Sequence, residues 1–292
     1  MARTNLKEKK TISQPNLKVV DKKAVKTTAY SDINLNEWRN YSHVKTDTLW
    51  EFPNRLKENG HSNEYHGNYI PQIAQQIYER YTKKGDVVLD MFFGSGTSGI
   101  EAINMGRRCI GVELKEDLAE KVSEKFTPKQ LVTDVNIICA DSASELAKDK
   151  IKARLDILGK KQAQLLMLHP PYDDIIKFSD KKEDLSNCAS TEEFYDLFEK
   201  VAKNGYDMLE KGRFACLIIG DKYADSQHIP LGFECMARMN KLGFITKAII
   251  IKDMQGNERA KGKTANLWRY RALAGGFYIF KHEYVMIFQK VR

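Results

Sequence analysis

Residues 87–99 read Val-Val-Leu-Asp-Met-Phe-Phe-Gly-Ser-Gly-Thr-Ser-Gly, an apolar run that ends on a carboxylate and then breaks into glycines. Four residues are enough for a buried parallel strand, and the glycines permit a tight turn and close approach of a ligand. From Thr97 onward, apolar residues recur at helical spacing. A strand, a glycine loop and a helix in this order present free backbone N–H groups to a ligand. The stretch therefore predicts a site for a nucleotide-like molecule.

The rest of the chain alternates strands and helices around this unit. Strands are predicted at residues 87–90, 108–113, 136–140, 164–168, 214–219, 244–251 and 284–288. Helices are predicted from residue 71, from residue 97, and at residues 115–126, 142–158, 191–209 and 230–241. This alternation indicates an α/β fold with a doubly wound, mostly parallel, seven-stranded sheet of the Rossmann-like type. Ligands of such sheets bind at the carboxyl ends of the strands, where Asp90, Glu113 and Asp141 should converge.

Two classes of ligand fit the glycine loop. The spacing Gly-x-Gly-x-x-Gly, followed by Glu113 at the end of the next strand, fits a dinucleotide, and thus a nicotinamide-dependent oxidoreductase. Asp90, however, would repel a pyrophosphate and would stabilise the amino group of a methionine moiety, which favours S-adenosylmethionine. Glu113 can accept hydrogen bonds from two ribose hydroxyls, and Asp141 can accept one from an adenine amine.

The same stretch resembles the Asp-Pro-Phe-x-Gly-Ser-Gly-Thr signature of DNA amino-methyltransferases, with Met91 where that family usually has proline. The resemblance implies a class I methyltransferase fold with S-adenosylmethionine as cofactor. In that family a segment similar to residues 65–77 closes over the methionine end of the cofactor, which makes Tyr69 a lining candidate. The predicted cofactor-binding residues are thus Tyr69, Asp90, Phe92, Gly94, Ser95, Gly96, Thr97, Glu113 and Asp141.

Chemistry is predicted at His169-Pro170-Pro171-Tyr172, where the fourth predicted strand ends. An exocyclic base amine is a poor nucleophile because its lone pair is delocalised into the ring, so an enzyme must accept hydrogen bonds from it and orient it. The double proline removes local N–H donors and leaves the Pro170 carbonyl free to accept, while Tyr172 offers a flat face to an extruded base. The tetrapeptide resembles the catalytic Asp/Asn/Ser-Pro-Pro-Tyr of N6-adenine and N4-cytosine methyltransferases.

His169 departs from that family pattern. A neutral imidazole nitrogen can accept a hydrogen bond from an amine, whereas imidazolium cannot. Turnover should therefore fall as the pH drops through the pKa of this histidine, near 6.5 if it is unperturbed. In one alternative the tetrapeptide is only a strand-ending turn in a protein that has lost catalysis. In another the protein is a non-enzymatic DNA-binding subunit.

The composition of the chain limits the kinds of partner that are expected for it. The chain has 292 residues, a formal net charge of +8 and a pI near 9.0, which describe one domain whose commonest polyanionic partner would be nucleic acid. Its five cysteines lack C-x-x-C spacing, so no metal site is expected and a reducing cytoplasm fits. No apolar run approaches 18 residues, so no membrane partner is expected.

Basic residues mark the predicted nucleic-acid contacts. Residues 1–28 are predicted to form a flexible basic arm, and residues 29–292 the methyltransferase domain, with DNA-contacting insertions near 173–190 and 252–271. Cations beside aromatics suit phosphate contact and base stacking. In the second insertion, these are Lys261, Lys263, Trp268, Arg269 and Arg271.

The predicted function is methyl transfer from S-adenosylmethionine to an exocyclic amine of a DNA base, adenine N6 or cytosine N4, at a specific site. The expected partners are double-stranded DNA with its target base flipped out, and a restriction endonuclease or companion subunit. An RNA base amine methyltransferase is an alternative, because the tetrapeptide also serves guanine-modifying RNA enzymes.

Overall fold

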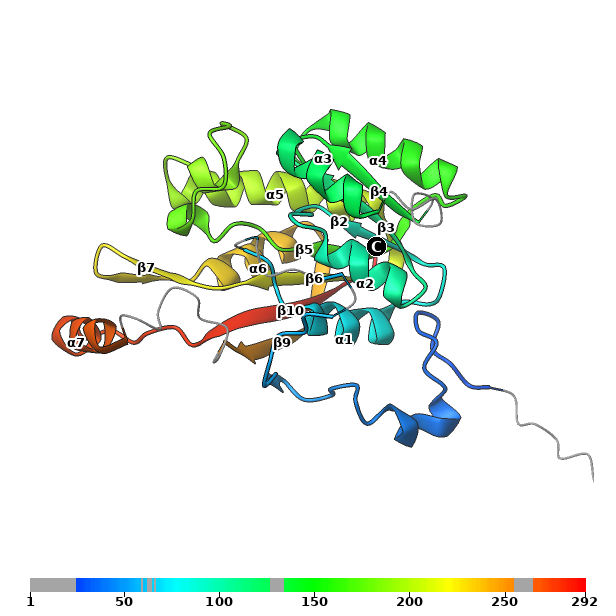
Figure 1. Ribbon diagram of the computed structural model, residues 1–292, viewed down its shortest axis with the longest axis horizontal. Helices are drawn as coiled ribbons and strands as arrows, with labels where there is room; N and C mark the ends of the chain where they lie inside the picture. Colours follow the sequence, from blue (N-terminus) through cyan, green and yellow to red (C-terminus); the bar gives the residue numbers. More distant parts are fainter. Residues whose placement is uncertain (1–24, 59, 62–64, 66, 127–133, 255–264) are drawn as a thin grey trace, which may run out of the picture.

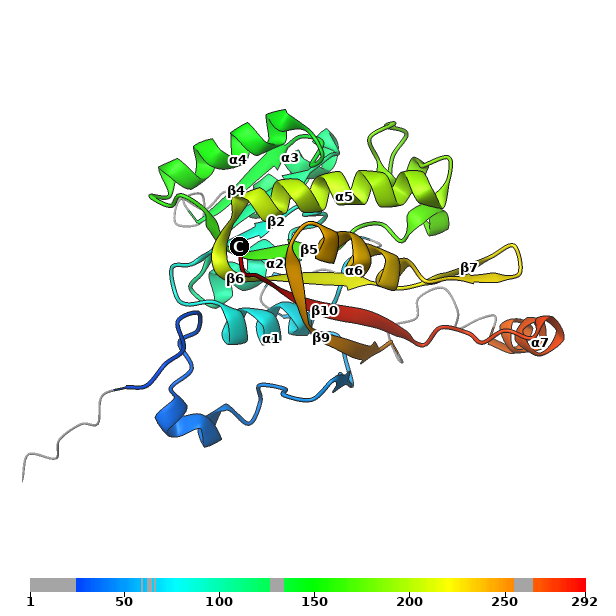
Figure 2. The same cartoon turned by 180° about the vertical axis from the view of Figure 1, so that it is seen from behind.

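The computed structural model describes residues 25–58, 60–61, 65, 67–126, 134–254 and 265–292. Its centre is an eight-stranded sheet in the order β1-β9-β10-β6-β5-β2-β3-β4, with helices on both faces (Figures 1 and 2). The strands are β1 (Leu49–Trp50), β2 (Val87–Asp90), β3 (Arg108–Glu113), β4 (Val135–Cys139), β5 (Ala163–Leu168), β6 (Leu209–Ile219), β9 (Phe244–Asp253) and β10 (His282–Lys290). A hairpin of β7 (Lys222–Ala224) and β8 (Gln227–Ile229) follows β6.

Helices cover the sheet in two groups. The helices are α1 (Pro71–Tyr81), α2 (Thr97–Asn104), α3 (Glu116–Lys125), α4 (Glu145–Ile157), α5 (Thr191–Met208), α6 (Leu231–Lys241) and α7 (Ala265–Gly275). Buried side chains of α1, α2 and α3 form a first core cluster with one face of the sheet. Those of α4, α5 and α6 form a second core cluster with the opposite face. Successive strand residues supply opposite faces: Leu89 packs into the second cluster and Val88 into the first.

The sheet topology places a switch point at β2. From β2 the chain passes outward through β3 and β4, then returns to β5 on the other side of β2 and continues to β6, all in parallel pairing. β10 runs antiparallel to both β6 and β9. The carboxyl ends of β2, β3 and β5 therefore meet at one edge of the sheet, which is where such folds bind ligands.

The seven predicted strands all lie in this sheet, which confirms the α/β, mostly parallel architecture. Two additions were not predicted: the edge strand β1, which pairs with β9 over two residues, and the β7–β8 hairpin. Both are too short to show the alternation of apolar and polar residues that identifies a strand in the sequence. β9 also extends beyond residue 251 to Asp253, which takes Lys252 out of the predicted DNA-contacting insertion and into the sheet.

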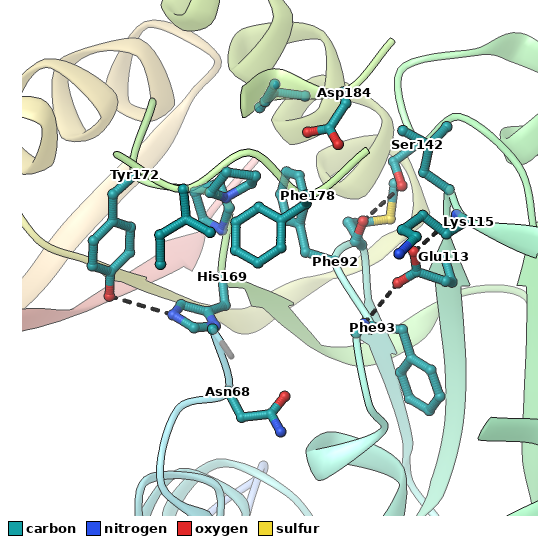
Figure 3. Close-up of a pocket in the computed structure, with 18 of the residues that line it drawn as sticks. Asn68, Phe92, Phe93, Glu113, Lys115, Ser142, His169, Tyr172, Phe178 and Asp184 are labelled. Atoms are coloured by element: carbon teal, nitrogen blue, oxygen red, sulfur yellow. Dashed lines mark hydrogen bonds between the residues drawn. The ribbon is translucent and has the colours of Figure 1, made fainter. Parts of the chain in front are cut away.

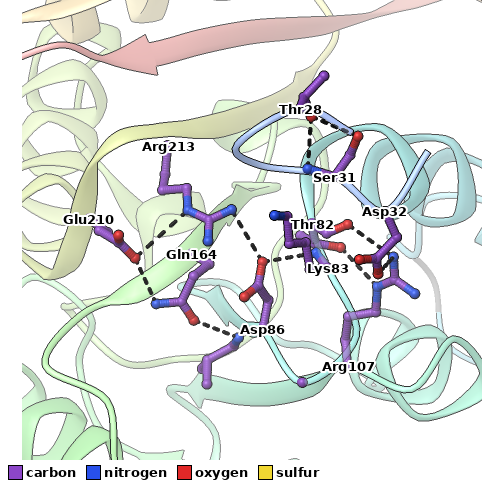
Figure 4. A network of polar contacts seen from close by, with 12 residues as sticks. Thr28, Ser31, Asp32, Thr82, Lys83, Asp86, Arg107, Gln164, Glu210 and Arg213 are labelled. Carbon is purple, nitrogen blue, oxygen red and sulfur yellow. Dashed lines mark hydrogen bonds and ion pairs between the residues drawn. The ribbon is translucent and has the colours of Figure 1, made fainter. Parts of the chain in front are cut away.

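The segment before α1 packs against the amino edge of the sheet. A polar network joins Asp32 to Arg107 and to the backbone N–H of Lys84, and joins Asp86 to Arg213 (Figure 4). Of the predicted basic arm, residues 1–24 lie outside the described residues, and the Lys26 carbonyl accepts a hydrogen bond from the Leu35 N–H. This network lies at the edge opposite to the carboxyl ends of the parallel strands, which leaves that edge open for a ligand. Among the described residues no helix is long and apolar enough to span a membrane.

Candidate active site

A cavity of about 430 Å³ opens at the carboxyl ends of β2, β3 and β5 (Figure 3). Its lining includes six of the predicted cofactor residues, namely Tyr69, Phe92, Gly94, Thr97, Glu113 and Asp141. It also includes the whole tetrapeptide His169-Pro170-Pro171-Tyr172. One cavity thus joins the glycine loop to the residues predicted to hold a base, and its volume lies in the usual range for small-molecule sites.

The glycine loop is shaped by backbone conformations that favour glycine. Gly94 and Gly96 have φ angles of +53° and +88°, and Gly96 precedes the first residue of α2. The loop is tied to β3, because the Gly94 N–H donates to the Glu113 carboxylate at 2.9 Å. The two elements that should hold a cofactor are therefore fixed relative to each other.

Glu113 ends β3 at the cavity wall. Its carboxylate accepts hydrogen bonds from the N–H groups of Gly94 and Lys115, both at 2.9 Å. Burial is the main cause that raises the pKa of Glu113 to about 7, and these hydrogen bonds partly oppose it. Each carboxylate oxygen has a second lone pair, so the group retains acceptors for ribose hydroxyls.

Asp90 does not line the cavity, and neither do Ser95 and Gly96. The Asp90 carboxylate accepts hydrogen bonds from the Phe92 N–H and the Ser98 hydroxyl, and Ser98 in turn is hydrogen-bonded to Tyr69. Burial raises the pKa of Asp90 to about 6. The structure therefore places Asp90 behind the wall, where it orders the loop through Ser98, because the first turn of α2 supplies a hydroxyl for its carboxylate.

Asn68 is a cavity residue that the sequence analysis did not single out. Its Nδ2 is buried and has no hydrogen-bond partner among the described residues, although the side chain lines the cavity (Figure 3). A buried amide donor without a partner is costly unless a ligand supplies an acceptor. Together with the acceptors of Glu113, this donor fits a ligand that carries both hydroxyl groups and an anionic or carbonyl group, as S-adenosylmethionine does.

His169 lies directly after β5 with its ring between two tyrosines. The rings of Tyr69 and Tyr172 are 5.3 and 5.7 Å away, both edge-on, and His169 Nε2 is 3.3 Å from the Tyr172 hydroxyl. Burial, the largest influence, lowers the pKa of His169 to about 4. The expectation of a pKa near 6.5 is thus corrected: the imidazole is neutral throughout the neutral pH range and can accept a hydrogen bond there.

Two charged residues that were not predicted to belong to the site support Tyr172. Its hydroxyl donates to Glu283 of β10 at 2.9 Å, and Glu283 forms an ion pair with Lys252 of β9 at 3.0 Å. Lys252 is only 2% exposed, so the expectation that it belongs to the DNA-contacting insertion is wrong. The signal was present in the sequence, because each residue is a charge within an apolar strand, but only the register places the two opposite each other.

The loop that follows the tetrapeptide covers the cavity. It begins with Asp173, whose φ of +53° is rare for a non-glycine residue and whose carboxylate pairs with Lys222. Phe178 and Asp184 line the cavity from this loop, and Lys181 donates to the Leu114 carbonyl at 2.8 Å. The predicted insertion at 173–190 therefore lies at the mouth of the cavity, and its contact with DNA stays a prediction.

The predicted nucleic-acid residues lie apart from the cavity. Trp268, Arg269 and Arg271 are on α7, which projects beyond the sheet together with the β7–β8 hairpin (Figure 1). Both arginines are exposed, and the Arg271 guanidinium lies 5.4 Å from the Trp268 ring centroid. Lys261 and Lys263 lie outside the described residues.

The proteins similar to this chain include a DNA adenine methyltransferase and a subunit of a probable restriction-modification enzyme. It is 31% identical over 134 residues to the DNA adenine methyltransferase YhdJ of Escherichia coli, which covers 45% of this chain and 42% of that protein. It is 36% identical over 87 residues to the "probable type III restriction-modification enzyme HindVI Mod subunit" of Haemophilus influenzae, covering 28% of this chain and 12% of the subunit. The chain thus spans less than half of the length of these relatives. Among solved structures, TrmN from Thermus thermophilus aligns with 77% of this chain and 50% of its own, at 16% identity and a TM-score of 0.48.

A family model described as DNA methylase matches residues 4–124 and 163–292. The matched ranges contain the glycine loop, Glu113 and the tetrapeptide that meet in the cavity. Because they make up more than half of the chain, this protein belongs to the DNA methylase family.

Proposed function

We propose that this protein transfers a methyl group from S-adenosylmethionine to an exocyclic amine of a DNA base, adenine N6 or cytosine N4, within a recognition sequence. The observation that carries the proposal is the single cavity that joins Glu113 and the glycine loop to His169-Pro170-Pro171-Tyr172. Family membership and the DNA adenine methyltransferase among its relatives support the same reaction class.

One group of cavity residues holds the cofactor and another holds the target base. S-adenosylmethionine, when bound, supplies an electrophilic methyl group. Glu113 accepts hydrogen bonds from the ribose, and the buried Asn68 amide donates to an acceptor on the ligand. Neutral His169 and the Pro170 carbonyl accept hydrogen bonds from the target amine and aim its nitrogen, while the Tyr172 ring stacks on the flipped base.

The proposed partners are double-stranded DNA, which this basic protein meets in the cytoplasm, and a restriction endonuclease or companion subunit. The Mod subunit among the relatives motivates the second of these.

The test is incubation with S-adenosylmethionine and duplex DNA, followed by mass spectrometry of the released nucleosides. We expect N6-methyladenine or N4-methylcytosine from DNA, and none from a matched RNA duplex. Methylated guanosine from the RNA alone would favour the RNA enzyme, and calorimetric binding of NAD in place of S-adenosylmethionine would favour an oxidoreductase.

A further inference from the structure

We infer that Glu283 and Lys252 are positioning residues that set the tautomer of His169 through Tyr172, so that His169 Nδ1 is the acceptor for the target amine. The inference rests on the proposed function, in which His169 holds that amine. It concerns a feature that an Asp, Asn or Ser at this position does not need, because their oxygens accept without a choice of tautomer.

The relay begins with a buried ion pair. Lys252 and Glu283 stand directly opposite each other on β9 and β10, with their charged atoms 3.0 Å apart. Burial is the largest single influence and would raise the pKa of Glu283, but Lys252, His169 and Tyr172 together outweigh it, so the pKa lies below its ordinary value. Glu283 is therefore a carboxylate and has no proton to donate.

The carboxylate dictates the direction of the next two hydrogen bonds. Tyr172 must donate its hydroxyl proton to Glu283, at 2.9 Å, because the carboxylate can only accept. The tyrosine oxygen has no second proton, so it can only accept from His169 Nε2 at 3.3 Å. Burial and then Glu283 raise the pKa of Tyr172 well above its ordinary value, which keeps the hydroxyl protonated.

It follows that the hydrogen of the neutral imidazole is on Nε2. The other nitrogen, Nδ1, then has a free lone pair, and it makes no hydrogen bond to a described residue. His169 lines the cavity and Figure 3 shows its second nitrogen on the side of the ring away from Tyr172. The other charges that act on this ring are those of Arg55, Lys252 and Glu283. In the opposite tautomer, Nδ1–H would face the N–H groups of the amine and repel them.

The first test is nitrogen NMR of the protein labelled with ¹⁵N-histidine, with a His169→Gln sample to identify the His169 signals. At neutral pH we expect Nε2 to be protonated and Nδ1 to be unprotonated. Tyr172→Phe retains the ring but removes the acceptor, and it should move both signals toward averaged values. Tyr206→Phe, which removes a hydroxyl bonded to the Arg292 carbonyl away from the cavity, should not. A protonated Nδ1 in the unsubstituted protein would overturn the inference.

The second test uses the pH profile of single-turnover methyl transfer. In Lys252→Met the pKa of Glu283 should rise, and protonated Glu283 can donate to Tyr172, which then donates to Nε2 and reverses the tautomer. We expect transfer to fall by about tenfold per pH unit below the new Glu283 pKa, and to recover at higher pH. Lys290→Met, which removes another buried lysine from β10, should keep the original profile.

The relay is wrong if Lys252→Met keeps the pH profile of the unsubstituted protein, or if its rate is low at every pH while the NMR signals of His169 still show the original tautomer. The proposed function fails separately: normal transfer by His169→Ala would remove the role of His169 as acceptor, whatever the NMR spectrum shows. The tautomer is measured without DNA or cofactor, so the two failures are distinguishable.

Discussion

At the scale of single residues, burial controls which groups around the cavity titrate. It raises the pKa of Glu113 to about 7 and lowers that of His169 to about 4, because each loses the water that stabilises its charged form. Glu113 therefore changes charge in the neutral range, while His169 does not. Cofactor binding and methyl transfer should respond differently to pH.

Cofactor affinity should follow the charge of Glu113. Its ionised form offers the acceptors that ribose hydroxyls need, so S-adenosylmethionine should bind more weakly as the pH falls below about 7. Glu113→Ala should weaken binding by on the order of 1 to 3 kcal/mol and abolish this pH dependence. Calorimetry between pH 6 and 8 measures both effects, with Glu145→Gln on the exposed start of α4 as control. A pH dependence that persists in Glu113→Ala would assign it to another group.

His169 should control the chemical step. Removing an oriented hydrogen bond to the transition state costs roughly a hundredfold in rate, so His169→Ala should slow transfer by about that much, and His169→Asn should retain part of the activity through its amide oxygen. At saturating DNA and cofactor, the rate should stay level down to about pH 5 and fall only near pH 4, because the imidazole becomes charged only there. Single-turnover assays with exposed His43→Ala as control test this. A decline centred near pH 6.5 would contradict the lowered pKa of His169.

At the scale of elements, two connections that leave the carboxyl edge of the sheet lie side by side, with the β7–β8 hairpin and α7 apart from the residues that line the cavity. β6 leads into the β7–β8 hairpin, β9 precedes α7, and the ring of Tyr223 stacks on that of Phe277 at 4.6 Å. Figure 1 shows the hairpin and α7 projecting on the same side of the molecule. We expect DNA to contact this side of the molecule, where the exposed cations of α7 lie.

α7 should contribute electrostatically to DNA binding. Neutralising Arg269 and Arg271 to Gln should reduce the slope of log affinity against log salt by about 1 for each phosphate that the protein no longer neutralises. Fluorescence anisotropy at several salt concentrations measures the slope, with Lys152→Gln and Arg154→Gln on α4 as a control pair. Equal slopes for the two double variants would place the DNA elsewhere.

At the scale of the whole molecule, the two edges of the sheet are specialised. Asp32 joins the N-terminal segment to the amino edge through an ion pair with Arg107 and a hydrogen bond from the Lys84 N–H (Figure 4), whereas the carboxyl edge keeps buried carboxylates beside an open cavity. Burying a carboxylate at the carboxyl edge disfavours its charged form. Asp90 shows this effect, because its folded-state pKa of about 6 exceeds its ordinary value of 3.8.

Asp90 should make folding stability depend on pH. A raised folded-state pKa means that the folded protein holds the proton more tightly, so this contribution is complete below about pH 4 and is lost as the pH rises through 6. As the pH rises from 5 to 8, the unsubstituted protein should lose this contribution and Asp90→Asn should not. The difference in unfolding free energy between the two proteins should therefore shift in favour of Asp90→Asn by on the order of 1 kcal/mol. Urea unfolding at both pH values measures this, and parallel pH profiles would contradict it.

The sequence by itself determined the order of the elements, the glycine loop, the acidic strand end at Glu113 and the tetrapeptide, because each is a local pattern of about four to thirteen neighbouring residues. Tertiary structure alone decided what lies behind them. Three features depend on which strands are neighbours and in what register they pair. They are the burial that shifts the pKa of His169, the position of Asp90 behind the cavity wall with Ser98 as its partner, and the pairing of Lys252 with Glu283. Register and desolvation depend on residues that are far apart in the chain. For this reason the sequence pattern assigned Lys252 to DNA contact, whereas the structure places it in the core.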